Sequence, residues 1–240
     1  MAQSSHLRYR SALGSLDARA TDDKMRRIIV AGLLVATAMV AVHAVTQLID
    51  FRVFNLRIRA FNADKHDSVF GLASLLAQAG LAAASWWRGN RAEGHRRAWI
   101  ALAAILVGLV LIRGLLPYNS KELAVPLVCV FWLLVWLTWR DPRAARTVVW
   151  VGLILMVASL LLHEVGPDAD SSLASDYTWS YQITGVVKHG AELAGWILLI
   201  TGVIAGIADR RTTEPAPPES SSPESSSPES FSREMESVGR

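Results

Sequence analysis

The chain has 240 residues, of which 52% are hydrophobic and 19% are charged, and its formal net charge is +3. A water-soluble domain usually carries about a quarter charged residues, and here the apolar excess is concentrated in six blocks. The composition therefore excludes a soluble globular enzyme, a fibrous chain and a secreted disulfide scaffold, and it predicts a multi-pass membrane protein.

The N-terminal segment, residues 1–27, is polar and basic. The apolar run that follows it is too long for the core of a cleavable signal peptide. We therefore expect a basic cytoplasmic segment followed by an uncleaved signal anchor.

Six apolar blocks define the predicted membrane domain, residues 28–208. A helix that crosses about 30 Å of hydrocarbon needs about 20 mostly apolar residues, and a lipid-exposed backbone must satisfy its own hydrogen bonds. None of the blocks shows strand-like alternation, and the fourth and fifth are short. The sequence predicts an all-α, polytopic bundle with six transmembrane helices: Ile28–Ile49, Val69–Trp87, Ala98–Leu116, Leu123–Trp139, Thr147–Leu162 and Val186–Ala208.

The distribution of Lys and Arg predicts the orientation, because cytoplasmic loops carry the excess of these residues. Basic residues gather in the N-terminal segment, after the second and fourth spans, and at Arg210 and Arg211 after the sixth. The loop from Glu164 to Gly185 has no Lys or Arg. Both termini are therefore expected inside the cell.

The first outer loop is the exception, since it contains Arg52, Arg57, Arg59 and Lys65. Two readings are open: a helix lying in the outer headgroup layer, or an irregular loop whose arginines contact headgroups. The helical reading rests on two adjoining sets at helical spacing: Phe51, Phe54, Ile58 and Phe61 on one face, and Arg52, Asn55, Arg59 and Asn62 on the other.

The C-terminal residues 209–240 contain a five-residue Pro/Glu/Ser repeat that begins at Pro218. Such a tract cannot bury enough apolar surface to offset the entropy of ordering. We expect a disordered cytoplasmic tail, either inert and solubilising or used for regulation or docking.

Polar residues within or beside the spans share the predicted outer level. They form helical stripes, which normally face a bundle interior or a water-filled cavity. This arrangement predicts an outward-opening polar cavity. Its candidate binding residues are His43, Gln47, Asp50, Asp67, Arg113, Lys188 and Glu192, with Ser74, Gln78 and Ser159 on the same stripes.

Simpler explanations remain open for several of these groups. Lys188 and Glu192, at i and i+4, could form a structural ion pair, and Arg113 could neutralise Glu192. Residues near the span ends, such as Asp67, could lie in hydrated headgroups.

Small and aromatic residues suggest packing functions. Gly202 and Gly206 form a Gly-x-x-x-Gly pair that could serve folding or dimerisation. An aromatic belt at the cytoplasmic interface is predicted from Trp86, Trp87, Trp99, Trp139 and Trp150. Cys129, the single cysteine, is predicted to be a small core residue.

Two short runs, Leu162-His163-Glu164 and His189 to Trp196, resemble a family of uncharacterised bacterial six-span integral membrane proteins. The resemblance implies six spans in a bacterial plasma membrane and no established reaction. The acidic pair expected near the end of the third span is replaced here by Arg113-Gly114-Leu115-Leu116.

Several functions fit these features. The first is a non-enzymatic protein that binds a lipid or small ligand or assists a larger complex. The second is a zinc-dependent hydrolase of a lipid-like substrate, with His43, His66, His163 and His189 as candidate ligands and Glu192 as general base. A third alternative is a proton-coupled transporter that uses Asp50, His189 and Glu192. A fourth is a membrane protein that binds a single haem between His43 and His189. Membrane lipids, and a homo-oligomer or larger membrane complex, are the expected partners, and nothing indicates nucleic acid.

Overall fold

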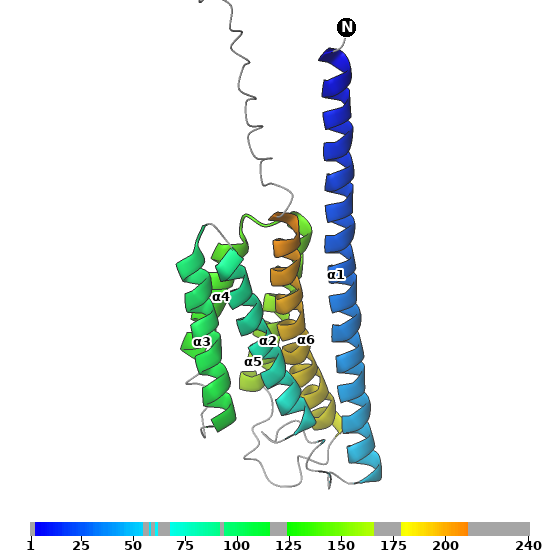
Figure 1. The fold of residues 1–240 in the computed structure, drawn as a ribbon. Coiled ribbons are helices and arrows are strands. Elements are labelled where there is room, and N and C mark those ends of the chain that lie inside the picture. Colours follow the sequence, from blue (N-terminus) through cyan, green and yellow to red (C-terminus); the bar gives the residue numbers. More distant parts are fainter. Residues whose placement is uncertain are drawn as a thin grey trace, which may run out of the picture.

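The computed structural model describes residues 3–54, 58, 61, 68–91, 94–115, 124–165 and 179–210, with side chains for most of them. Figure 1 shows six helices, arranged side by side apart from the N-terminal part of α1. The helices are α1 (Gln3–Val53), α2 (Val69–Arg91), α3 (Arg96–Leu115), α4 (Ala124–Thr138), α5 (Arg143–Val165) and α6 (Trp179–Arg210). The predicted Pro/Glu/Ser tail after residue 210 lies outside the described residues.

Five of these helices are long and apolar enough to cross a membrane, and α4 is a shorter apolar helix. The prediction of an all-α, multi-pass membrane protein is confirmed at this level. Helices α1, α2, α5 and α6 extend beyond the predicted spans, most clearly α1, which contains 51 residues, whereas α4 is one residue shorter at each end than the predicted fourth span. Helical hydrogen bonding continues past the apolar core because the flanking polar residues are also compatible with a helix.

Helix α6 occupies the centre of the bundle, where it packs against α1, α2 and α5. Close approach to α5 depends on glycines: a Cβ on Gly202 would lie 2.5 Å from Cγ2 of Val149, and one on Gly195 would lie 3.0 Å from the carbonyl oxygen of Gly152. The Gly-x-x-x-Gly pair that begins at Gly202 therefore serves packing within the chain.

Helix α1 packs along one side of α6 and leaves its opposite face exposed (Figure 1). Met25 packs with Ala145 and Ala205, and Ala36 packs with Val148 and Leu198. The buried positions of α1 are separated by 4, 11, 7, 4 and 3 residues, intervals that keep them on one face of a helix with 3.6 residues per turn.

Short connections set the ends of the other helices. The hydroxyl of Ser68 accepts a hydrogen bond from the N–H of Gly71 at 2.9 Å, which caps α2. Between α2 and α3, His95 has a φ of 60°, and its carbonyl accepts bonds from the N–H groups of Ala98 and Trp99. Helices α2 and α3 consequently run antiparallel and in contact.

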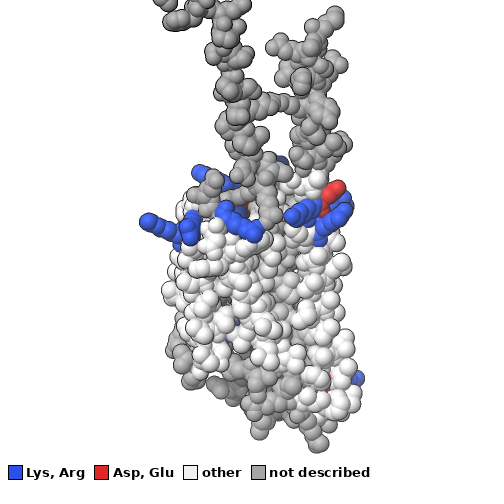
Figure 2. All heavy atoms as spheres, in the orientation of Figure 1, with Lys and Arg blue, Asp and Glu red and all other residues white. Residues whose placement is uncertain are grey.

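Figure 2 shows basic side chains in a band across one end of the bundle, which we call the basic end. The α2–α3 and α4–α5 connections and the last turns of α6 lie there. Its exposed basic residues are Lys24, Arg26, Arg27, Arg91, Arg96, Arg97, Arg140 and Arg143. The end where α1 stops and α2 begins is called the opposite end.

Of the two readings left open for the first outer loop, the described residues do not show a continuous interfacial helix over Phe51–Phe61. Helix α1 ends at Val53, and Ile58 is not helical. The N–H of Ile58 bonds to the Asp50 carboxylate at 3.0 Å. An aspartate side chain can compete with the backbone for such bonds, which is consistent with the end of α1 at Val53. Its other residues, Asn55, Arg57, Arg59 and Asn62 among them, lie outside the described residues.

Candidate functional site

The polar stripes predicted in α1, α2 and α6 turn inward and meet near the opposite end. We call this group the polar layer; its members are at most 8% exposed. It consists of His43, Gln47, Asp50, Ser74, Gln78, Gln182, His189 and Glu192. Polar groups removed from both water and lipid need partners within the protein, so the contacts among these side chains define what the layer can do.

Glu192 connects three helices of the bundle. Its Oε1 accepts a hydrogen bond from the Ser74 hydroxyl at 2.7 Å and another from Nη1 of Arg113 at 2.8 Å. The two charged side chains are only 10% and 18% exposed, respectively. A carboxylate with these two donors, one of them charged, is held firmly in place; α2, α3 and α6 are joined through it.

His43 and His189 meet about one helical turn from Glu192, on the side of the opposite end. The ring centroids of His43 and His189 are 6.2 Å apart, and the rings are perpendicular. Phe70 packs against both, at 4.6 Å from His43 and 4.9 Å from His189. An aromatic wall beside two imidazoles makes this part of the layer mixed in character, with hydrogen-bonding nitrogens next to an apolar surface.

The part of the polar layer nearest the opposite end joins the C-terminal end of α1 to the N-terminal end of α6. Nε2 of Gln47 donates a hydrogen bond to Oε1 of Gln182 at 2.7 Å. Asp50 is fully buried and holds the backbone of Ile58. Among the described residues, Oε1 of Gln47 and Oδ2 of Asp50 accept no hydrogen bond, so this level retains acceptor capacity.

A small cavity lies next to the polar layer, between α1 and α2. Its volume is about 50 Å³, and His43, Thr46, Phe70, Ala73 and Leu193 line it together with four other apolar residues. Those are Met39, Val42, Phe61 and Val69. Val42 and Val69 are 57% and 58% exposed, so the cavity reaches the outer surface of the bundle between the two helices.

The candidate metal ligands are only partly tested by these positions. His43 and His189 come together, whereas His66 and the side chain of His163 lie outside the described residues, as does Asp67. Within the described part, no three His, Cys, Asp or Glu side chains are close enough to hold a metal ion. The zinc site therefore stays a prediction.

The haem alternative does not fit the described side chains around the same histidines. Phe70 contacts both imidazoles, and the neighbouring cavity of about 50 Å³ is far smaller than the ~300 Å³ at which small-molecule sites begin. The described residues provide no space for the macrocycle.

Lys188 of the candidate set is half-buried on α6. Glu192 is held by Arg113, which the sequence had offered as one of two possible counter-ions.

Gln182 and Phe70 were not selected from the sequence, although a signal was present. Gln182 precedes His189 by seven residues and Phe70 precedes Ser74 by four, so each lies on the same helical face as its neighbour. The predicted sixth span began only at Val186, which left Gln182 outside the pattern.

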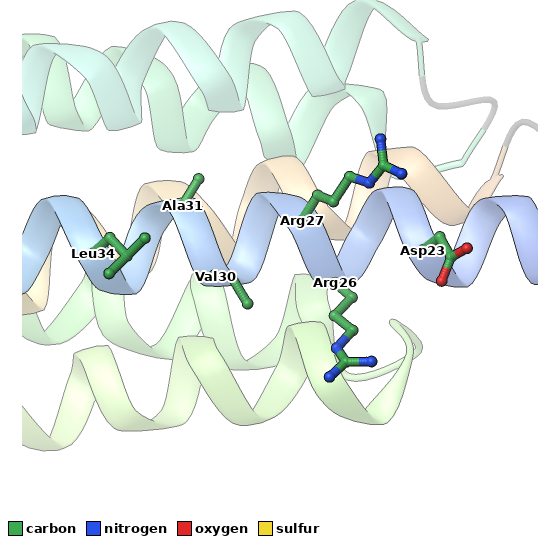
Figure 3. A pocket seen from close by; sticks show the side chains of 6 residues that line it. All are labelled: Asp23, Arg26, Arg27, Val30, Ala31 and Leu34. Atoms are coloured by element: carbon green, nitrogen blue, oxygen red, sulfur yellow. The ribbon is translucent and has the colours of Figure 1, made fainter.

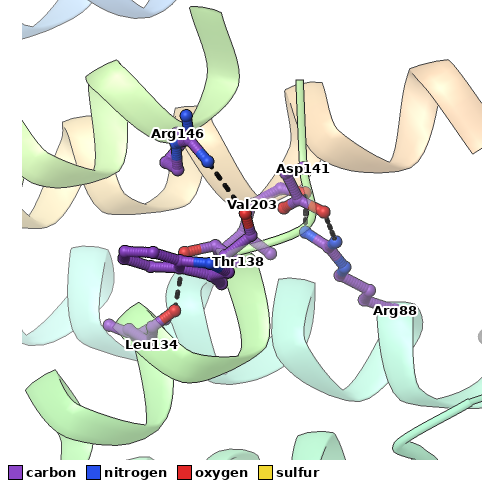
Figure 4. Close-up of polar contacts among 7 residues, drawn as sticks. Arg88, Leu134, Thr138, Asp141, Arg146 and Val203 are labelled. Atoms are coloured by element: carbon purple, nitrogen blue, oxygen red, sulfur yellow. Dashed lines mark hydrogen bonds and ion pairs between the residues drawn. The ribbon is translucent and has the colours of Figure 1, made fainter. Parts of the chain in front are cut away.

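A second buried polar group lies at the basic end and was missed entirely (Figure 4). Nη2 of Arg88 donates to Oδ1 of Asp141 with side chains 2% and 1% exposed, and Nη1 donates to the carbonyl of Val203 at 3.3 Å. The guanidinium also lies 4.4 Å from the ring of Trp99. Trp99, 1% exposed, is thus a core residue and not part of the aromatic belt. Asp141 was detectable as the only acid in an arginine-rich loop.

Cys129 is also placed differently from the prediction of a core residue. Its side chain is exposed on α4, where the surrounding exposed residues, Val125, Val128 and Trp132, are apolar. This face of α4 suits contact with lipid.

Comparison of the chain with protein-family models, with curated proteins and with solved structures gives no match.

Proposed function

We propose that this protein crosses a bacterial plasma membrane six times, with both termini in the cytoplasm, and that its polar layer binds a lipid-like ligand from the outer leaflet. The basic end supports this orientation, because positively charged loops stay on the cytoplasmic side. With that end inside, the polar layer and its cavity lie in the outer half of the membrane. Helix α4 is then the sixth crossing, with its 15 helical residues extended by neighbouring segments or matched by local thinning of the bilayer.

The observation that carries the ligand proposal is the composition and position of the cavity. Seven of its nine described lining residues are apolar, and the two polar ones are His43 and Thr46. The Thr46 hydroxyl already bonds to the carbonyls of Val42 and His43 at 2.9 Å. His43 is then the polar group best placed to recognise a ligand there.

The volume of about 50 Å³ limits what can enter. It exceeds the roughly 15 Å³ needed by one water molecule but holds only a small part of a larger ligand. The ligand therefore lies mainly along the exposed α1–α2 seam, against Val42 and Val69, and inserts one group toward His43. A molecule with a long apolar body and one hydrogen-bonding group, such as a carbonyl or hydroxyl, meets both requirements.

The remaining polar layer supports the binding site from behind. Leu193 lines the cavity while its neighbour Glu192 is fixed by Ser74 and Arg113. Phe70 lines the cavity and packs on both histidines. This support keeps the His43 side of the cavity in one arrangement, which lowers the cost of ordering the site on binding.

Filling the cavity tests the proposal. Ala73 lines it, whereas Ala79 lies on the exposed face of the same helix. The full-length protein is reconstituted in phosphatidylcholine vesicles containing a diazirine-bearing phosphatidylcholine in the outer leaflet, and cross-linked peptides are quantified. We expect cross-links on the cavity-lining parts of α1 and α2 that fall at least about fivefold in Ala73→Leu and stay unchanged in Ala79→Leu.

Equal cross-linking of the two variants, or wild-type cross-links spread evenly over all lipid-facing helices, would contradict the proposal. Thermal unfolding of each variant is measured alongside. If Ala73→Leu is poorly folded, the distribution of cross-links in the wild-type protein alone decides the matter.

A further inference from the structure

A groove on the outward face of α1 lies at the basic end, far from the cavity that faces the polar layer. Its described lining residues all belong to α1: Asp23, Arg26, Arg27, Val30, Ala31 and Leu34. The groove has a volume of about 430 Å³, and all six residues are exposed. The opposite face of α1 packs on α5 and α6 through Met25, Ile28 and Ile29, so the groove faces away from the bundle.

The groove changes character along the helix axis. Figure 3 shows Arg26 and Arg27 extending to opposite sides of α1, with Asp23 beyond them toward the N-terminus and Val30 and Leu34 in the other direction. At 1.5 Å per residue, Asp23 lies about 5 Å before the middle of the arginine pair, and the apolar positions begin about 5 Å after it. The order is therefore carboxylate, then two guanidiniums, then an apolar wall.

The two guanidiniums are available to a ligand. Among the described residues neither Arg26 nor Arg27 forms an ion pair, although Asp22 and Asp23 are close in sequence. Two arginines at the point where an apolar helix meets the membrane surface are suited to bind phosphate oxygens. The groove carries a formal charge of +1 from two Arg and one Asp, which favours a ligand with one negative charge.

We propose that this groove is a binding site for an anionic glycerophospholipid of the cytoplasmic leaflet, specifically phosphatidylglycerol. The guanidiniums of Arg26 and Arg27 extend to opposite sides of α1 in the structure, so these exposed side chains turn toward the phosphate on binding. The phosphate then accepts hydrogen bonds from both, and one acyl chain lies along Val30, Ala31 and Leu34. The headgroup glycerol extends toward water and donates a hydroxyl hydrogen bond to Asp23. The order of groups in the lipid matches the order of groups along the groove.

The charge ring of the basic end provides a matched control. Arg96 and Arg97 are another adjacent, exposed arginine pair at the same end, and they do not line the groove. Arg26→Gln/Arg27→Gln and Arg96→Gln/Arg97→Gln remove the same charge from the same surface. They therefore separate a specific site from general attraction of anionic lipid to the basic ring.

The test is native mass spectrometry of the full-length protein titrated with phosphatidylglycerol, phosphatidylethanolamine, phosphatidylcholine or phosphatidic acid in a neutral detergent. We expect one tightly retained phosphatidylglycerol. Its affinity falls at least about tenfold in Arg26→Gln/Arg27→Gln, because hydrogen bonds from charged donors to the phosphate are lost, and by at most about twofold in the control pair, which removes charge that does not contact the lipid. Asp23→Asn removes the preference for phosphatidylglycerol over phosphatidic acid.

Equal losses in the two double variants, or equal retention of phosphatidylcholine and phosphatidylglycerol by the wild-type protein, would overturn the proposal. So would a wild-type dimer that Arg26→Gln/Arg27→Gln dissociates, since the occupant would then be a second copy of the chain. If that variant fails to insert, a photoreactive phosphatidylglycerol on the wild-type protein must label residues 23–34, and labelling elsewhere refutes the site.

Discussion

Removing the Asp141 carboxylate is expected to destabilise the protein strongly. Arg88 is 2% exposed, and Asp141→Ala leaves its charge buried beside the Val203 carbonyl and the face of Trp99 without the carboxylate. Breaking one partner of a buried ion pair costs about 3–5 kcal/mol. At about 2–4 °C per kcal/mol for a chain of this size, Tm should fall by roughly 6–20 °C.

The double variant distinguishes an ion pair from simple loss of packing. Arg88→Met/Asp141→Ala removes both charges and leaves an apolar side chain in the same space, so its cost should be smaller than the sum of the single costs by about 2 kcal/mol or more. Arg143→Ala removes an exposed charge at the same end and should change stability by less than about 0.5 kcal/mol.

Thermal unfolding of purified protein in detergent is followed by tryptophan fluorescence. It is measured for five proteins: the wild type, Arg88→Met, Asp141→Ala, their double variant and Arg143→Ala. A Tm for Asp141→Ala within about 2 °C of wild type would refute the assignment of Arg88 and Asp141 as a stabilising buried ion pair. So would a cost of the double variant equal to the sum of the two single costs.

Two further predictions concern the packing of α6 and the support of the polar layer. A Cβ on Gly206 would lie 2.6 Å from Oδ2 of Asp141, so Gly206→Ala should cost about 1–3 kcal/mol in the same unfolding assay. A Cβ on Gly108 would meet no described atom within 4 Å, so Gly108→Ala should not destabilise the protein. Equal effects of the two substitutions would count against the packing argument. Arg113→Met removes the charged hydrogen-bond donor of the Glu192 carboxylate, which keeps the bond from the Ser74 hydroxyl, and should cost about 3 kcal/mol. Glu192→Gln should cost at most half as much, because Arg113 can move its charge toward the nearby membrane surface; the reverse order would show that Glu192 does not depend on Arg113.

The inward direction of the polar stripes could be predicted because it depends on local geometry alone. His43, Gln47 and Asp50 share one face at the 3.6-residue period, and the cost of placing them in lipid leaves only the bundle interior. Their burial follows whatever the neighbouring helices are.

Which polar side chains pair with each other was less predictable, because the pairing depends on the distance and the rotation between neighbouring helices. Lys188 at i−4 and Arg113 on another helix were both reasonable partners for Glu192. The sequence contains no information on how far α3 turns toward α6, and this rotation places Arg113 at 2.8 Å.

The buried Arg88–Asp141 ion pair at the basic end was missed for a related reason. The positive-inside rule treats every loop arginine as a surface charge, so Arg88 was counted with its exposed neighbours. Gly89 and Gly206 have no side chains; the helices approach closely enough there to enclose the guanidinium, since a Cβ on Gly206 would lie 2.7 Å from Nη1 of Arg88.

Both lipid proposals require the basic end to face the cytoplasm, and cysteine labelling tests this directly. In a Cys129→Ser background, a single cysteine replaces Ser180 at the exposed start of α6 or Arg143 at the basic end. A membrane-impermeant maleimide applied to intact cells should label the cysteine at 180 and should reach the one at 143 only after permeabilisation. Labelling of position 143 in intact cells, with position 180 protected, would contradict the orientation and with it the placement of the polar layer in the outer half of the membrane.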